Sequence, residues 1–153
     1  MTKEIDDIDR RILHHLQRDA SLTADDIAER VALSRNACWR RIKAMEERGV
    51  IRGRVVLVDP ALVGCPLEVV ILVRTSRHEA AWMEGFQKTL RALPEVVGAY
   101  RMTGELDYLL RVRVADMPQY DAFYKRLIAR VSVSDISASF VMEEIKETTA
   151  LPL

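Results

Sequence analysis

The segment 34–49, SRNACWRRIKAMEERG, constrains the fold of this chain more than any other. Its apolar residues recur at helical spacing and form one narrow stripe, made of Cys38, Ile42 and Met45. Ser34 is a favoured N-cap residue, and Gly49 supplies the left-handed conformation that ends a helix. The opposite face carries Arg35, Asn36, Trp39, Arg40 and Lys43. These side-chain types bind phosphate oxygens and base edges, so the segment predicts a helix with a polyanion-binding face.

Two shorter helices are predicted before this segment. Residues 6–18 place apolar side chains at helical spacing, and residues 23–31 do the same after a capping box of Thr23 and Asp26. Only Ala32 and Leu33 separate the second helix from the third. Three short helices with the last two joined this tightly predict a helix-turn-helix unit, whose final helix enters the major groove of DNA.

The distribution of charge supports this interpretation better than net charge does. The chain has 23 basic and 23 acidic side chains, so its composition does not indicate a general polyanion binder. Residues 1–29, however, carry four basic and eight acidic side chains, whereas residues 30–54 carry eight basic and two acidic ones. The basic block coincides with the third helix and the residues that follow it, as a DNA-binding surface requires. The alternative is an ordinary solvated basic face.

Several other classes of protein are disfavoured. No apolar run approaches the roughly 20 residues of a membrane span, and the N-terminus lacks the core of a signal peptide, so we expect a cytoplasmic protein. Cys38 and Cys65 do not indicate a disulfide framework. His14, His15 and His78 have no Cys or His at ligand spacing, so neither a metal nor a cofactor is expected.

The sequence changes character after the third helix. Residues 50–58 alternate loosely and are followed by Asp59-Pro60 and Gly64-Cys65-Pro66, a pattern that predicts a strand and then a linker. We therefore expect a DNA-binding domain over residues 1–54, a strand and linker over 55–65, and a second domain over 66–153.

The second domain has the pattern strand, helix, strand, strand, helix, strand. The expected strands span 67–75, 96–103, 106–115 and 136–145, and the expected helices are 80–93 and one with Pro118 in its first turn. This order is that of a ferredoxin-like βαββαβ domain, so the fold class is α+β. Its helices cover one face of the sheet. Because the first strand is apolar on both faces, a second subunit is the expected cover for the other face.

In this order and at these spacings, the chain resembles the Lrp/AsnC (leucine-responsive and asparagine-responsive) family of transcriptional regulators. The matching segments are DDIDRRILHHLQ (6–17), LTADDIAERVALS (22–34), CWRRIKAMEERGVI (38–51), GRVVLVDPALVG (53–64), LPEVVGAYRMTGELDYLLRVRV (93–114) and the terminal EEIKETTALPL. The resemblance implies a winged helix-turn-helix and a RAM domain, which forms dimers or larger even-numbered oligomers and binds a small effector, usually an amino acid. Arg54 stands where such proteins frequently have an aromatic residue, and adds charge near the DNA. With Ser34, it joins the predicted DNA contacts.

The candidate effector site begins at the predicted hairpin turn, residues 103–108. A glycine in a tight turn, here Gly104, can expose consecutive backbone N–H groups to a carboxylate, and Asp107 can pair with an ammonium group. These are the two charged ends of a free amino acid. By resemblance, Gly104, Asp107 and Tyr108 match the effector motif, with Thr103 beside them, and a neighbouring subunit completes the pocket through Ser134, Asp135, Ser137 and Ser139. The alternative is a plain hairpin, with Asp107 solvated and Tyr108 in the core.

The sequence therefore predicts a regulator that is not an enzyme and that binds double-stranded DNA. Subunit pairing places two recognition helices on one side of the duplex, so the operator is expected to be pseudo-palindromic. Two alternatives remain. One is an architectural DNA-binding protein that needs no effector. The other is an enzyme resembling the sirohaem decarboxylases, which share this architecture but carry histidines in the linker and second domain, where this chain has only His78.

Overall fold

The computed structural model describes residues 5–77 and 79–153, so His78 lies outside the described residues. The chain divides into two compact units, which we describe separately. One contains residues 5–57 together with Lys146–Leu153, and the other is Val58–Ile145. The C-terminal segment belongs to the first unit because Leu151 and the Gln17 side chain exchange two hydrogen bonds, of 2.7 and 2.8 Å. No helix among the described residues is both long and apolar enough to cross a bilayer.

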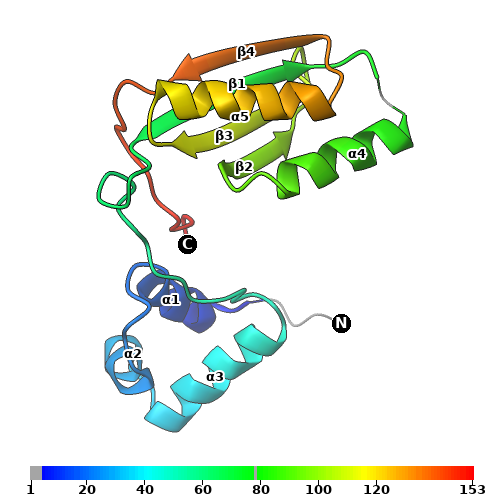
Figure 1. Cartoon of the computed structure of the whole chain (residues 1–153). Coiled ribbons are helices and arrows are strands. Elements are labelled where there is room, and N and C mark those ends of the chain that lie inside the picture. Colours follow the sequence, from blue (N-terminus) through cyan, green and yellow to red (C-terminus); the bar gives the residue numbers. More distant parts are fainter. Residues whose placement is uncertain (1–4, 78) are drawn as a thin grey trace. The chain divides into compact units, whose positions relative to one another are not determined.

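The first unit contains the three predicted helices (Figure 1): α1 is Asp7–Leu16, α2 is Ala24–Val31 and α3 is Arg35–Glu47. Each begins at a side chain that accepts a backbone N–H, which satisfies one of the donors that a helix start leaves free. The N-cap residues are Asp6, Thr23 and Ser34, and the first two form capping boxes with Asp9 and Asp26. The predicted stripe of Cys38, Ile42 and Met45 is buried in the core of this unit.

The turn between α2 and α3 depends on an alanine in an unusual conformation. Ala32 has a φ of 57°, in the left-handed region that residues other than glycine rarely adopt. The Leu33 N–H then donates to the Ala28 carbonyl at 2.9 Å, which closes the end of α2. At the other end of α3, Gly49 has a φ of 73°, as the sequence predicted. The two left-handed residues therefore fix where α3 begins and ends.

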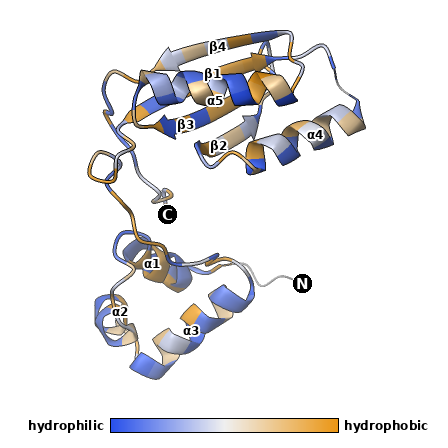
Figure 2. Cartoon of the chain, viewed as in Figure 1, coloured by the Kyte–Doolittle hydropathy of each residue, from blue (hydrophilic) through white to orange (hydrophobic). Residues whose placement is uncertain are grey.

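No strand forms between α3 and β1 in the described single chain. The strand predicted within residues 50–58 is therefore wrong for the described single chain, because these residues have no neighbouring strand to pair with. Val55, Val56 and Leu57 are 77%, 87% and 73% exposed. Figure 2 shows the hydrophobic colouring along part of this connecting segment.

The second unit has the predicted order of elements, with strands somewhat shorter than expected. The elements are β1 (Leu67–Arg74), α4 (Ala80–Arg91), β2 (Val96–Arg101), β3 (Tyr108–Val114), α5 (Met117–Arg130) and β4 (Asp135–Phe140). All pairings are antiparallel, and the strand order is β2-β3-β1-β4, as in a ferredoxin-like domain. β4 ends at Phe140 rather than 145. Phe140 pairs with Val69, close to the start of β1 at Leu67, so few residues of β1 remain to pair with those after Phe140.

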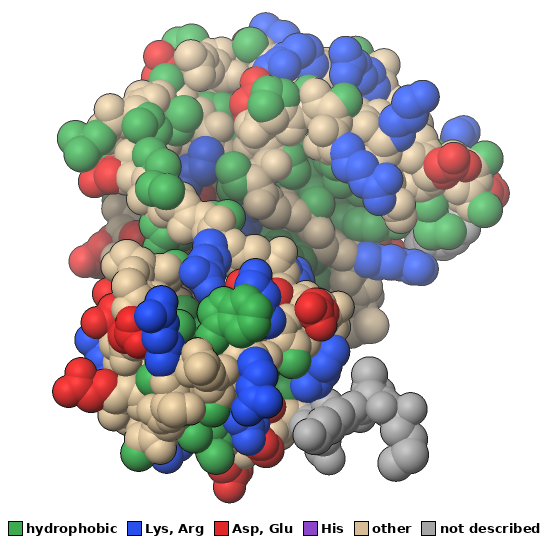
Figure 3. Space-filling model, turned by 90° about the horizontal axis from the view of Figure 1, so that it is seen from below, with side chains coloured by type: hydrophobic (Ala, Val, Ile, Leu, Met, Phe, Trp, Pro, Cys, Tyr) green, Lys and Arg blue, Asp and Glu red, His purple; other side chains and the backbone are tan. Residues whose placement is uncertain are grey.

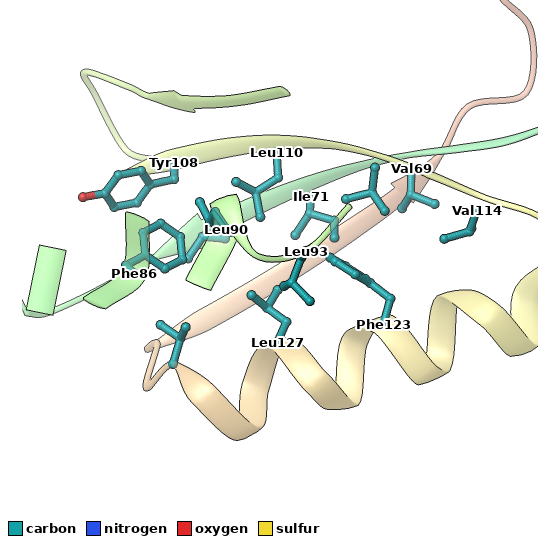
Figure 4. Packing of buried hydrophobic residues seen from close by; sticks show 13 residues of the cluster. Val69, Ile71, Phe86, Leu90, Leu93, Tyr108, Leu110, Val114, Phe123 and Leu127 are labelled. Carbon is teal, nitrogen blue, oxygen red and sulfur yellow. The ribbon is translucent and has the colours of Figure 1, made fainter. Parts of the chain in front are cut away.

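One face of this sheet packs against α4 and α5 (Figure 1). Alternate residues of β1 and β3 point to the helices, including Val69, Ile71 and Leu110, which are completely buried. Figure 4 shows Phe86 and Leu90 of α4 and Phe123 and Leu127 of α5 directed into the same layer.

The other face of the sheet has no cover in the single chain. Val70 and Leu72 of β1 lie on it, half-buried, with Leu109 opposite Leu72. Tyr100 is 51% exposed, and its ring lies over Gly98, where a Cβ atom would come within 3.1 Å of Tyr100 Cε2. Glu68 is buried beside this patch and pairs with Arg111 and Arg113. The open face therefore joins an apolar patch to a compact ion-pair network.

Candidate functional site

The outer face of α3 is exposed, as the sequence predicted. Trp39 is 53% exposed, and the side chains of Arg35 and Lys43 are 72% and 49% exposed. On the first unit, Figure 3 shows Lys and Arg side chains gathered around an exposed hydrophobic one. The Ser34 hydroxyl accepts the Ala37 N–H at 3.3 Å and so fixes the first turn of the helix. This surface combines cations, an amide and an aromatic ring on one rigid element.

Three of the predicted DNA contacts are paired with acidic side chains. Arg35 lies 3.4 Å from Asp25 of α2. Glu46 accepts hydrogen bonds from both Lys43, at 2.9 Å, and Arg54, at 3.3 Å. The basic surface is therefore less positive than a count of its cations indicates.

Arg41 holds α3 in place and was not identified from the sequence. Its guanidinium donates to Asp6 and Asp9 of α1, both at 2.8 Å. The Asp9 side chain is only 9% exposed and that of Arg41 is 33% exposed, so this is a partly desolvated ion pair between two helices. The one signal in the sequence is the position of Arg41 beside the buried stripe, where a charged residue needs a partner.

In the second unit, one end of the sheet brings together part of the predicted effector site. Gly104 has a φ of 104°, in the conformation expected for an exposed turn. Asp107 follows it, and its Oδ2 atom accepts the Thr75 backbone N–H at 2.8 Å. The Asp107 backbone N–H donates to the Val73 carbonyl at 3.1 Å. Asp107 is thus half-buried and held against the end of β1, rather than fully solvated as the plain-hairpin alternative required.

Ser134 lies just before β4, which flanks β1 on the side opposite to β3, and it contacts the same segment. Its hydroxyl accepts the Ser76 backbone N–H at 2.9 Å, and its own N–H donates to the Arg74 carbonyl at 2.9 Å. An open concavity of about 410 Å³ lies beside it and is lined by Tyr124, Ile128 and residues 131–136, which include Asp135. Asp107 and Ser134 therefore flank the residues that follow β1.

The other predicted effector residues lie elsewhere. Tyr108 is 7% exposed and packs edge-on against Phe86 in the core, as the alternative interpretation held. Ser137 and Ser139 lie opposite Leu72 and Val70, and so belong to the open sheet face. Thr103 is exposed in the β2–β3 loop. The described single chain does not bring these four side chains to one pocket.

Metal and thiol chemistry have no geometric basis among the described residues. No group of three or more His, Cys, Asp or Glu side chains there could hold a metal ion. Burial raises the pKa of the Cys38 thiol, so this residue behaves as part of the core.

Comparison with known proteins agrees with the two-unit architecture. Residues 5–52 match the winged helix-turn-helix DNA-binding family, and residues 68–151 match the Lrp/AsnC ligand binding domain. The chain is a member of the Lrp/AsnC family. This family consists of DNA-binding transcriptional regulators and not of enzymes, so the decarboxylase alternative is removed.

Individual relatives of this Lrp/AsnC regulator span nearly its whole length. The DNA-binding transcriptional activator DecR of Escherichia coli is 45% identical over 150 residues, which cover 97% of this chain and 99% of DecR. The crystal structure of an AsnC family regulator from Agrobacterium tumefaciens is 50% identical, with a TM-score of 0.93 and 97% of each chain covered. A Neisseria meningitidis regulator in complex with L-Met is 38% identical, with a TM-score of 0.92 and the same coverage.

The first turn of α1 predicts how the stability of this regulator depends on pH. The pKa of Asp6 lies below its ordinary value because the carboxylate accepts the Asp9 backbone N–H and pairs with Arg41. A carboxyl group whose pKa is lowered by folding stabilises the protein above its unfolded pKa, and this contribution is lost as the pH falls through the folded pKa. We therefore expect the melting temperature of the DNA-binding unit to decrease when the pH is lowered below about 4.

The matched variants are Asp6→Asn and Asp7→Asn. Asparagine is also a good N-cap but does not titrate, so Asp6→Asn should make the acid dependence shallower. Asp7→Asn removes the same charge one residue away and should leave the dependence close to that of the wild type. Helix content followed by circular dichroism during thermal melts measures both. An equally steep acid dependence in Asp6→Asn would contradict the assignment.

Proposed function

We propose that this regulator contacts double-stranded DNA through the exposed face of α3, at a pseudo-palindromic operator, and that binding of an amino acid to the second unit changes its DNA affinity. The observation that carries the DNA part is the exposed set of Trp39, Arg40 and Lys43 on a helix whose opposite side is buried. Arg35 and Asn36 lie in the first turn of α3, where recognition helices meet base edges. Arg54 extends the basic surface into the connector. Residues 1–54 then form the DNA-binding domain, 55–65 the connector and 66–153 the effector domain, in the cytoplasm.

The amino-acid effector is supported by chemistry and by one relative. Among the described residues, Asp107 uses Oδ2 to bind the Thr75 N–H, which leaves Oδ1 to accept from an ammonium group. Gly104 at a φ of 104° suits the turn whose N–H groups would bind a carboxylate. The related Neisseria structure contains L-Met, an amino acid. In our proposal a second subunit supplies the remaining part of the pocket, from among Ser134, Asp135, Ser137 and Ser139.

A homodimer, or a larger even-numbered oligomer, is proposed from the surfaces that the single chain leaves uncovered. Val70, Leu72 and Leu109 form an apolar patch on the open sheet face. The connector adds Val55 and Val56, whose extended backbone lacks a pairing strand. Exposed apolar surface of either kind is typical of subunit interfaces. Pairing of two subunits would also supply the two recognition helices that a pseudo-palindromic operator requires.

Variants of α3 test the DNA-binding face. Arg40→Gln and Lys43→Gln should each weaken binding to a mixed-sequence duplex and make the negative slope of log K against log salt shallower by about 0.9. Arg35→Ala and Asn36→Ala should instead cost about 1–3 kcal/mol at the cognate operator, and less on other sequences. Lys125→Gln, on the exposed surface of α5, is the control for loss of one positive charge. Fluorescence anisotropy with labelled duplexes measures these affinities, and unchanged binding in all four α3 variants would mean that another face contacts DNA.

The Asp107 carboxylate tests the effector site. Asp107→Asn keeps an oxygen that can accept the Thr75 N–H but removes the charge that would bind an ammonium group. The variant should therefore melt near the wild-type temperature and lose any rise in melting temperature produced by an L-amino acid, since only a ligand that prefers the folded state raises it.

Each of the twenty amino acids, including L-methionine, is the probe, and Asp121→Asn on α5 is the control. An amino acid that stabilises wild type and Asp107→Asn equally would show that the pocket lies elsewhere. If no amino acid stabilises the wild type, the result would support the alternative of an architectural DNA-binding protein that needs no effector.

The open sheet face predicts the oligomeric state. Leu72→Glu places an uncompensated charge in the proposed interface and should shift the assembly to smaller species. Met117→Glu introduces the same side chain at the start of α5, at a residue that is 54% exposed, and should not. Sedimentation equilibrium distinguishes the species. A wild-type protein that is monomeric at every concentration, or an unchanged Leu72→Glu assembly, would contradict the proposed interface.

A further inference from the structure

Glu46 occupies a special position on the DNA-binding unit because it binds two cations from different parts of the chain. Its Oε2 atom accepts a hydrogen bond from Lys43 Nζ at 2.9 Å, one turn earlier on α3. Its Oε1 atom accepts from Arg54 Nη2 at 3.3 Å, in the segment that follows α3. The Glu46 side chain is 30% exposed, and those of Lys43 and Arg54 are 49% and 46% exposed. One carboxylate therefore sits between two of the proposed phosphate contacts.

The carboxylate is chemically similar to the group that these cations would bind on DNA. Hydrogen bonding from Lys43 lowers the pKa of Glu46, and the charge of Arg54 lowers it further, so the carboxylate is ionised at neutral pH. Carboxylate and phosphate oxygens both accept from ammonium and guanidinium donors. A phosphate that approaches Lys43 or Arg54 must therefore displace the carboxylate or share the cation with it. It also experiences the repulsion of the negative charge of Glu46.

We propose that Glu46 competes with DNA phosphate for Lys43 and Arg54 and thereby lowers the affinity of the regulator for any duplex, whatever its sequence. The inference rests on the proposed DNA-binding face. Phosphate contacts carry no base information, so the reduction applies equally to cognate and unrelated DNA. Glu46 thus acts as a built-in limit on the electrostatic part of binding.

Glu46 could instead have a positioning role, which predicts the opposite change in DNA affinity. If the main effect of Glu46 were to hold Arg54 against α3 in a geometry that DNA needs, removing the carboxylate would weaken binding. The sign of the change therefore separates competition from positioning. The geometry favours competition, because exposed ion pairs of this kind contribute little to holding a side chain in place.

The test compares Glu46→Gln with wild type on a fluorescein-labelled duplex of mixed sequence. Loss of exposed pairs worth about 0.2–1 kcal/mol predicts binding that is tighter by about 1.4- to fivefold. The slope of log K against log salt should become steeper by about 0.9. One further side-chain cation is then available to neutralise a phosphate, which releases a counterion condensed on the DNA. Glu47→Gln is the matched control, since it removes the same charge from the next residue, and should give a smaller gain. Glu46→Ala should reproduce the tighter binding.

A second background separates this inference from the proposed face. In Lys43→Gln/Arg54→Gln, the additional Glu46→Gln change should give no more than the small gain of Glu47→Gln, because its two partners are absent and only the repulsion between its charge and phosphate is lost. Weaker or unchanged binding of Glu46→Gln, an equal gain in Glu47→Gln, or a gain that is as large in the double variant as in the wild type would each overturn the competition. If Lys43→Gln/Arg54→Gln itself binds DNA as tightly as the wild type, the proposed face is wrong and the inference fails with it.

Discussion

The attachment of α3 to α1 through Arg41 supports the whole proposed DNA-binding surface. Asp9 accepts the Asp6 N–H that begins α1 and also accepts a hydrogen bond from Arg41. One buried carboxylate therefore defines the start of the first helix and the position of the third. Removing Arg41 would leave the Asp9 carboxylate without its cation in a site that is only 9% exposed, which is destabilising. The outer face of α3 can be rigid because its inner side is fixed by both apolar packing and this ion pair.

Local sequence signals predicted the limits of these helices, and distant partners explain what they missed. The capping box of Thr23 and Asp26, the N-cap at Ser34 and the stop at Gly49 involve residues within a few positions of one another, so their chemistry is visible in the sequence. Ala32 was predicted only as part of a short turn, because an alanine side chain gives no signal of the left-handed conformation that ends α2. Arg41 binds partners 32 and 35 residues away, and no local pattern identifies them.

The same distinction applies to the second unit. The order of its strands and helices follows from periodicity and turn residues, but the ends of its strands depend on where their neighbours end. The expected strand near Val55 failed because an alternating pattern does not supply a pairing partner. Asp107 was predicted from its place after Gly104, whereas its bond to Thr75 joins residues 32 positions apart. Tyr108 was assigned to the effector site by resemblance, and the structure places it in the core beside Phe86.

The acidic partners of the basic surface bear on how an effector could control DNA binding. Coupling between two ligands on one protein is typically worth about 1–3 kcal/mol, which changes affinity by roughly 5- to 150-fold. A factor of this size changes operator occupancy only if the affinity without effector is close to the affinity needed to fill the operator. If the protein binds far more tightly than that, the operator stays occupied with or without effector. If Lys43 and Arg54 acted without the competing charge of Glu46, additional phosphate affinity would keep the protein on DNA of any sequence, and a modest coupling would have less effect. A basic surface limited by its own carboxylates is therefore consistent with regulation by a small molecule that binds in the other unit.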